Sequence, residues 1–378
     1  MEEDKRIVWV DWLKVTACFM VMVVHSSEPF YLGGNGALIE NGSDALWLAF
    51  FDSLARSCVP LFVIASSFLL FPLNYSAGTF FKKRAMKILI PFALWSLFYA
   101  FYWGDPATNL KGLLLNFNYP AGHLWFIYML AGLYLIMPLL SPWARNVGKK
   151  ELSVYIGIWF FSTLIPLIRD WVSTEPMAIV YGPTGIPRQA LYPLFGEACW
   201  NNYSIFYYMS GFVGYLLVGL WLRKFGADIS RKKALLTAIP CFIVGFIICF
   251  GGFVRRVFTM AGGHFPVGET SGDSVWWETT WGYDSVGVAL MAIGAVLLIM
   301  RITSCGKFYR YAISPISKAS YGMYLCHMAV LAFYAELFRS IIPSTPLVIL
   351  ATAVASFITV AVAAVGLRRI PLIGKLIV

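Results

Sequence analysis

Ten apolar runs, each about as long as a membrane-spanning helix, recur along this chain of 378 residues. A helix of about 20 apolar residues crosses the hydrocarbon core of a bilayer and satisfies its own backbone hydrogen bonds there. Hydrophobic residues make up 59% of the sequence and charged residues 13%, which is more apolar than a soluble fold requires. We therefore expect an all-α, polytopic membrane protein with one integral-membrane domain over residues 1–378 and no soluble domain. The expected helices cover residues 8–29, 46–72, 87–104, 123–141, 153–169, 203–222, 234–254, 282–301, 318–338 and 345–367.

The positions of lysine and arginine give these helices an orientation. If the N-terminus is cytoplasmic, the dense basic segments around residues 82–87, 145–150, 223–233, 307–310 and 368–375 all fall on the cytoplasmic side. The opposite loops carry only scattered basic residues, so the positive-inside rule predicts ten crossings with both termini cytoplasmic. The net charge of +10 builds no contiguous basic face, and no nucleic-acid partner is expected. The seven cysteines have no metal-ligand spacing, and no metal site is expected.

Lys14 and His25 lie inside the first apolar run, where ionisable groups are costly and are therefore candidates for function. Eleven helical steps place both on one face, about 16 Å apart along the axis. His25, toward the outer end, is the candidate general base, and Asp11 or Glu28 could orient it or balance charge. The competing structural interpretations are an ion pair between Lys14 and Asp11, and a buried His25 satisfied by a backbone carbonyl.

Further basic residues are candidates for holding an anion. Arg56 cannot lose its charge within an apolar run, so it must pair with an acid or face a wet cavity. Lys83, Arg84 and Lys87 open the third expected helix, where side-chain cations and backbone amides together suit phosphate groups. The alternative is that this basic loop only sets the topology.

Two more groups of polar residues lie in apolar runs. His123 and Trp125 begin the fourth expected helix at its outer end. Ser320, Tyr324 and His327 share one stripe of the ninth, because seven steps nearly close two turns. Such a stripe faces the interior of a helix bundle, either as contact between helices or as the lining of a site.

The outer connections, residues 170–202 and 255–281, are rich in aromatic residues. They read either as the aromatic belt of a membrane protein or as a surface on which sugars stack. The tryptophans concerned are Trp171, Trp200, Trp276, Trp277 and Trp281.

The stretch VDWLKVTACFMVMVVHSSEP, residues 10–29, resembles the first helix of the integral-membrane acyltransferase 3 family. The signature of that helix is an Arg or Lys, ten residues and a His, and Lys14 and His25 match it. Four further stretches resemble the family's motifs in the same order along the chain, with Ser67 in place of the usual Gly and Lys87 in place of the second Arg of RxxR. They are RSCVPLFVIASSFLL (56–70), RAMKILIP (84–91), HLWFIYMLAGLY (123–134) and SYGMYLCH (320–327).

The resemblance implies transfer of an acyl group, acetyl first among the candidates, from cytoplasmic acyl-CoA to a hydroxyl of a glycan or lipid-linked saccharide on the outer face. His25 would be the general base or would carry the acyl group, with Lys14, Asp11 and Glu28 around it. Arg56, the basic loop and the Ser320 stripe would hold the donor, and His123 and Trp125 the acceptor. The resemblance also implies a bacterial plasma-membrane protein surrounded by lipid, with a homodimer left open.

Two rival interpretations start from the same residues. A secondary transporter or flippase would use intramembrane Lys, Arg and His for substrate passage, although the two halves of the chain show no internal repeat. A different membrane acyltransferase fold with a lone histidine is the other rival, and the ordered motifs argue against it.

Overall fold

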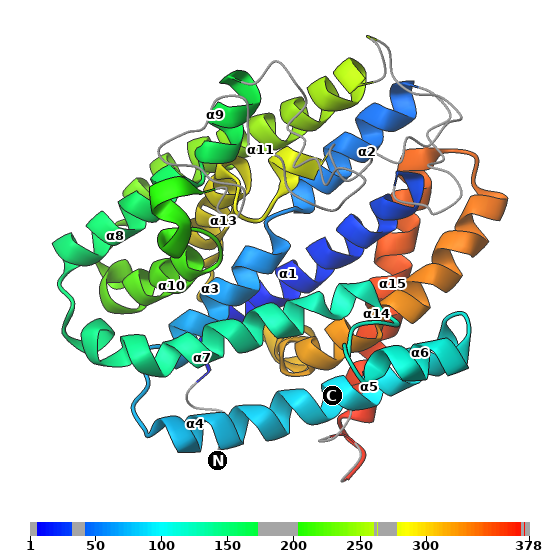
Figure 1. Ribbon diagram of the computed structural model, residues 1–378, viewed down its shortest axis with the longest axis horizontal. Helices are drawn as coiled ribbons and strands as arrows, with labels where there is room; N and C mark the ends of the chain where they lie inside the picture. Colours follow the sequence, from blue (N-terminus) through cyan, green and yellow to red (C-terminus); the bar gives the residue numbers. More distant parts are fainter. Residues whose placement is uncertain are drawn as a thin grey trace. The chain divides into compact units, whose positions relative to one another are not determined.

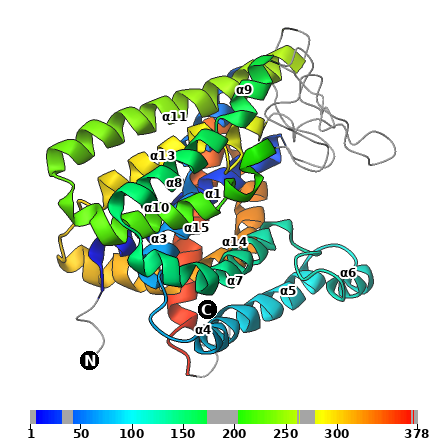
Figure 2. The ribbon, with the colours of Figure 1, turned by 60° about the vertical axis from the view of Figure 1, so that its left-hand side comes forward.

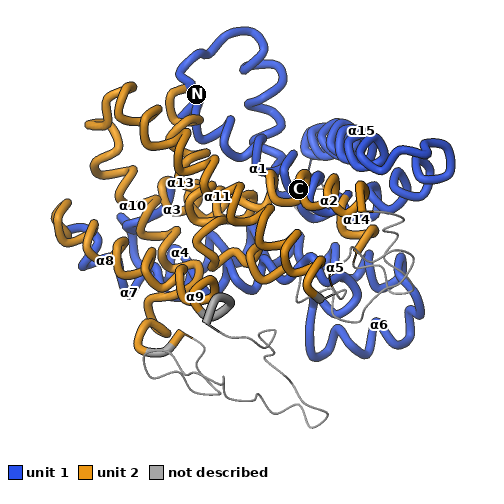
Figure 3. Tube along the Cα trace, turned by 90° about the horizontal axis from the view of Figure 1, so that it is seen from above, with its two compact units in different colours: residues 1–26, 69–146, 302–378 blue, residues 27–68, 147–301 orange. Residues whose placement is uncertain are grey.

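The computed structural model describes residues 6–31, 42–172, 203–260, 263, 278–371 and 374. These residues form α-helices joined by short 3-10 and π segments and include no strand, as the order of elements in Figure 1 shows. The expected all-α fold is confirmed. The chain forms two compact units, with unit 1 made of residues 1–26, 69–146 and 302–378 and unit 2 of residues 27–68 and 147–301 (Figure 3).

Unit 1 is held together by helices from both ends of the chain. The helices α14 and α15 pack along each other, and α5 contacts α14. A buried cluster of Val15, Tyr309 and Ile313 joins α1 to the start of the C-terminal helices. The elements of unit 1 are α1 (Val8–Ser27), α4 (Ala77–Arg84), the π segment η3 (Ala85–Leu89), α5 (Ile90–Tyr102), α6 (Pro106–Leu113), η4 (Gly122–Leu124), α7 (Trp125–Asn146), the π segment η8 (Tyr309–Ile313), α14 (Ser314–Ile341) and α15 (Thr345–Leu367).

Unit 2 is built around the long helix α11 (Arg231–Met260), which packs along α13 (Val286–Ile299), as Figure 2 shows. Two glycines allow this close approach, because a Cβ on Gly287 would lie 2.7 Å from Cys249 Sγ and one on Gly245 would lie 2.5 Å from Gly287 O. The other elements are η2 (Glu28–Phe30), α2 (Gly42–Ala55), most of α3 (Cys58–Leu70), α8 (Lys149–Ser162), α9 (Ile165–Val172), η5 (Ser204–Met209), α10 (Val213–Phe225), η6 (Gly226–Asp228) and η7 (Glu278–Trp281).

Within unit 2, the helices α3 and α10 meet at Ser67 and Gly219. A Cβ on Gly219 would lie 2.5 Å from the Cβ of Ser67, so only glycine leaves room for the serine. The Ser67 hydroxyl donates a hydrogen bond to the carbonyl of Leu216. The departure from glycine at position 67 is therefore accommodated by a glycine on the facing helix.

Nine helical stretches of the described residues are long and apolar enough to cross a membrane, where ten were expected. The missing one is 203–222, which divides into η5 and the 13-residue helix α10. Such a helix is about 20 Å long, less than the roughly 30 Å hydrocarbon core. The expected helix 46–72 is also interrupted, by a turn at Arg56 and Ser57.

Candidate functional site

Three histidines from three separate parts of the chain gather in unit 1. The ring centroid of His327 on α14 lies 5.0 Å from that of His25 on α1 and 5.0 Å from that of His123 on η4. His327 is fully buried, His123 is 9% exposed, and His25 is half-buried. Of the residues described by the structure, no group of three or more His, Cys, Asp or Glu side chains is arranged to hold a metal ion. The ring of His327 is tilted by 42° to that of His25 and meets that of His123 edge to face at 87°.

The hydrogen bonds of His327 define its tautomer. Its Nδ1 lies 2.6 Å from the carbonyl oxygen of Tyr324, and a carbonyl only accepts, so Nδ1 carries the proton. In the neutral ring Nε2 is then a lone-pair acceptor. Neither this Nε2 nor that of His123 has a hydrogen-bond partner among the described residues, although both atoms are buried. The cluster thus offers the Nε2 acceptor of His327 and a second buried imidazole nitrogen, Nε2 of His123, that the described part of the fold does not satisfy.

Tyrosines fix the histidine cluster in place. The hydroxyl of Tyr324 donates to the carbonyl of His123, and that of Tyr99 on α5 donates to the carbonyl of Leu325 at 2.9 Å. The ring of Tyr99 also meets the ring of His123 edge to face at 5.1 Å. These bonds connect α5 and η4 to α14, so the cluster sits on rigid elements. Sequence reasoning missed Tyr99, since nothing distinguishes it within the aromatic run from 98 to 103.

Lys14 lies on the same continuous helix as His25, about 16 Å away along the axis. It is half-buried and forms no hydrogen bond or ion pair with any residue that the structure describes. The suggested ion pair with Asp11 is therefore wrong. Asp11, Arg6 and Lys87 are the charged groups that act on Lys14. This end of α1 consequently holds a lysine with charges of both signs nearby and no ion-pair partner among the described residues.

Asp11 is engaged by other residues at the start of α1. Both its oxygens accept hydrogen bonds from Arg6, and Tyr309 and Ser317 donate to it at 2.6 Å and 2.7 Å. Burial opposes the charge of Arg6, but the hydrogen bond and the charge of Asp11 prevail and raise the pKa of Arg6. Asp11 lies 14 residues, about 21 Å, from His25, so it anchors α1 to the C-terminal helices and does not touch the imidazole.

The basic loop lies at the junction of α4 and η3. Lys83 lies 4.9 Å above the ring of Tyr75, and the buried Nε of half-buried Arg84 has no hydrogen-bond partner among the described residues. Lys87 falls within the π segment, whose wider turn changes the offset expected between side chains three residues apart. Lys83 and Lys87 are exposed, which leaves them open to an anion.

Arg56 lies in unit 2 and is paired, the first of the two situations expected for it. Its guanidinium binds Asp52 through two nitrogens, donates to the hydroxyl of Tyr31 at 2.7 Å and to Glu278 at 3.2 Å, and lies 4.8 Å above the ring of Trp281. The spacing of Asp52 four residues before Arg56 is a helical ion-pair signal that could have been recognised. These contacts give Arg56 a structural role. Binding of the acyl donor by Arg56 stays a prediction.

The remaining candidates occupy simpler positions. Ser320 is half-buried, and its carbonyl lies 3.9 Å from the thiol of Cys18 on α1. Trp125, also half-buried, packs beside Phe126, and Glu28 begins η2 after α1 ends. None of these contacts adds a reactive group to the histidine cluster.

The sugar-stacking hypothesis fails for Trp281. Its side chain is 1% exposed, stacks on Phe253 with centroids 3.8 Å apart, and donates to Ser53 at 2.7 Å. A buried indole cannot offer a face to a sugar. The side chains of Trp171, Trp200, Trp276 and Trp277 lie outside what the structure describes.

These features define a polytopic membrane protein with a histidine cluster at one end of its first helix and, at the other, a lysine that has no ion-pair partner in the described part of the chain. The family model described as an acyltransferase domain, acyltransferase 3, matches residues 7–367. The chain belongs to this family and is a membrane acyltransferase. No curated protein and no solved structure matches it. The family match favours the acyltransferase over the transporter.

Proposed function

We propose that this membrane acyltransferase moves an acyl group, acetyl in the simplest case, from cytoplasmic acyl-CoA to a hydroxyl of a glycan or related saccharide on the outer face of a bacterial plasma membrane. The observation that carries the proposal is the polarity of α1. At one end His25 lies against His327 in the histidine cluster, and at the other Lys14 has no ion-pair partner among the residues that the structure describes.

The cationic end suits the donor. Coenzyme A carries a pyrophosphate and a ribose phosphate, and Lys14, Lys83, Arg84 and Lys87 all belong to unit 1. Like charges at close range are unfavourable until an anion joins them. Lys87 gives a point charge in place of a bidentate arginine, so phosphate selectivity would rest more on Arg84.

The histidine end suits the chemistry. A nitrogen of His25 takes the acceptor's hydroxyl proton while the oxygen attacks the thioester carbonyl carbon. The resulting oxyanion collapses, the C–S bond breaks, and the thiolate of coenzyme A receives the proton. The Nε2 acceptor of His327 would orient His25 and the proton it carries.

A second mechanism uses the same residues and the same donor and acceptor. His25 attacks the thioester itself, coenzyme A leaves as the thiol, and the acyl-imidazole then passes its acyl group to the hydroxyl. This course separates the two half-reactions in time. It therefore suits a donor and an acceptor that arrive from opposite sides of the membrane.

Isotope exchange distinguishes these courses. Purified protein is incubated with unlabelled acetyl-CoA and labelled coenzyme A in the absence of any acceptor. Appearance of label in acetyl-CoA indicates an acyl-enzyme, whereas direct transfer gives no exchange and acylates membrane glycolipids only after these are added. Solute uptake into vesicles with neither exchange nor transfer would overturn the proposal.

A further inference from the structure

An apolar cavity of about 400 Å³ lies within unit 2, between α8, α10, α11 and α13. Aliphatic side chains form most of its wall, including Ile156, Val218, Leu222 and Val296. Pockets that hold small molecules span about 300–1,000 Å³, so the cavity is large enough for a ligand. Its lining implies that the ligand is mainly hydrocarbon.

The rim of the cavity is polar and cationic. Trp221 lines it and donates to the hydroxyl of Ser153, another lining residue, at 3.0 Å. The ammonium of Lys149 lies 5.4 Å above the same indole. Lys233 also lines the cavity, is exposed, and forms no ion pair with any residue in the described part of the chain. Lys233 is therefore the cation of the rim, and Lys149, which also pairs with Asp228 at 4.0 Å, lies beside the lining Trp221.

The first turn of α11 holds Arg231, Lys232 and Lys233 and no acid. The N-terminal end of a helix carries a partial positive charge, so three cations there repel both the helix dipole and one another. An anion at this position would relieve both repulsions. The same basic segment is predicted to face the cytoplasm, where the leaflet is rich in anionic lipid.

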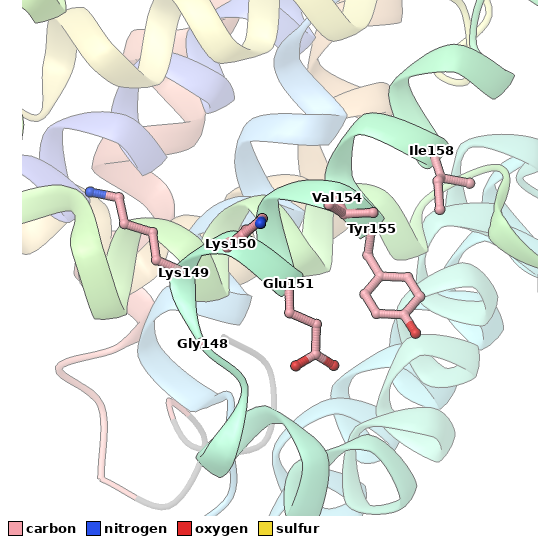
Figure 4. A pocket seen from close by; sticks show the side chains of 7 residues that line it. All are labelled: Gly148, Lys149, Lys150, Glu151, Val154, Tyr155 and Ile158. Carbon is pink, nitrogen blue, oxygen red and sulfur yellow. The ribbon is translucent and has the colours of Figure 1, made fainter.

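A second hollow, of about 620 Å³, follows the other side of α8 and is lined only by residues 148–158 (Figure 4). In Figure 4 the side chain of Lys149 points away from Glu151 and Tyr155. Because one stretch of chain forms its whole lining and Glu151 opposes an anion, this hollow is the weaker candidate.

We propose that the cavity between α8, α10, α11 and α13 binds an acyl chain of an anionic phospholipid from the cytoplasmic leaflet, with the phosphate held by Lys233 and Lys149. The apolar wall of the cavity, its cationic rim and the negative charge of the cytoplasmic leaflet all match an anionic phospholipid. The site is separate from the acyl-transfer chemistry, and it does not depend on the identity of the donor or acceptor.

Native mass spectrometry of the delipidated full chain in detergent micelles tests the charge recognition. Phosphatidylglycerol and phosphatidylcholine with identical acyl chains are titrated separately. A basic residue near an anionic lipid contributes about 1 kcal/mol, so Lys233→Gln should weaken phosphatidylglycerol binding about fivefold and leave phosphatidylcholine unchanged. Lys307→Gln, an exposed lysine in unit 1, is the matched control and should change neither.

A second pair of variants tests the cavity. Thr237 lines it from an exposed position on α11, so Thr237→Phe should fill it and weaken binding of both lipids. The adjacent Leu236 is 65% exposed and does not line the cavity, so Leu236→Phe should bind as the wild type does. Equal binding of the two lipids by the wild type, equal losses in Lys233→Gln and Lys307→Gln, or unchanged binding in Thr237→Phe would each overturn the proposal.

Discussion

The imidazole of His327 lies against that of His25, with ring centroids 5.0 Å apart and planes inclined by 42°. Since the Nδ1 proton of His327 is directed to the carbonyl of Tyr324, the side of the ring bearing Nε2 is the one free to act. His327 is thus suited to position His25, and it need not react itself.

Replacing His327 should slow turnover more than it weakens donor binding. His327→Phe keeps a buried ring and removes both nitrogens, and a misplaced catalytic group costs on the order of 10²-fold in kcat. We expect the KM for acetyl-CoA to change little. His327→Gln retains a polar acceptor and should recover part of the loss, as steady-state kinetics of the purified variants would measure. An equal fall in both variants, matched by Cys326→Ala, would point to a packing role only.

The two tyrosines that connect α5 to α14 should differ in their contribution to stability. Tyr99 is buried and donates to Leu325 O at 2.9 Å, whereas Tyr102 is exposed and donates to Ala329 O at 3.3 Å. Tyr99→Phe leaves a buried carbonyl with one partner fewer, which costs about 1–3 kcal/mol. Tyr102→Phe serves as the matched control and should cost little. Thermal unfolding in micelles measures both, and equal shifts would contradict the assigned burial.

Arg56 and Asp52 should show strong coupling in a double-mutant cycle. Removing one partner of a buried pair leaves the other charge unpaired and costs about 3–5 kcal/mol. Arg56→Gln and Asp52→Asn should therefore each destabilise the protein, and the double variant should lose less than their sum. The exposed pair of Lys149 and Asp228, 4.0 Å apart, is the control, with about 0–1 kcal/mol expected. If Arg56→Gln raised the KM for the donor without affecting stability, Arg56 would belong to the donor site.

The Lys14→Met variant should lower the affinity for the donor without lowering the stability of the protein. A half-buried lysine without a direct counter-ion contributes little to stability, so the variant should unfold at or above the wild-type temperature. Its KM for acetyl-CoA should rise about tenfold or more, as for loss of a charged hydrogen bond of about 1.5–3 kcal/mol. Thr16→Val, two residues along α1, removes no charge and controls for packing. A destabilised Lys14→Met with normal donor affinity would mean that Lys14 is structural.

Much of the helical layout could be predicted from sequence because apolar run length is a local property. The last expected helix, 345–367, coincides with α15. The expected helix 203–222 is divided in the structure into η5 and α10, an interruption that the length of an apolar run does not reveal.

The contacts of the site could be predicted only in part. The face shared by Lys14 and His25 follows from helical period. In contrast, Glu278 reaches Arg56 across 222 residues, and no local pattern specifies such a contact. Trp281 was misassigned because an aromatic loop residue looks the same in sequence whether it is exposed or buried. The meeting of three histidines likewise depends on tertiary packing.

The most direct measurement is transfer of labelled acetyl from acetyl-CoA to membrane glycolipids by wild type and His25→Ala, with binding of coenzyme A followed in parallel. His25 lies away from the cationic end of α1, so the variant should bind coenzyme A as the wild type does and lose transfer by about 10²–10⁴-fold, the usual contribution of a general base. Full transferase activity in His25→Ala would contradict the central role given to this imidazole.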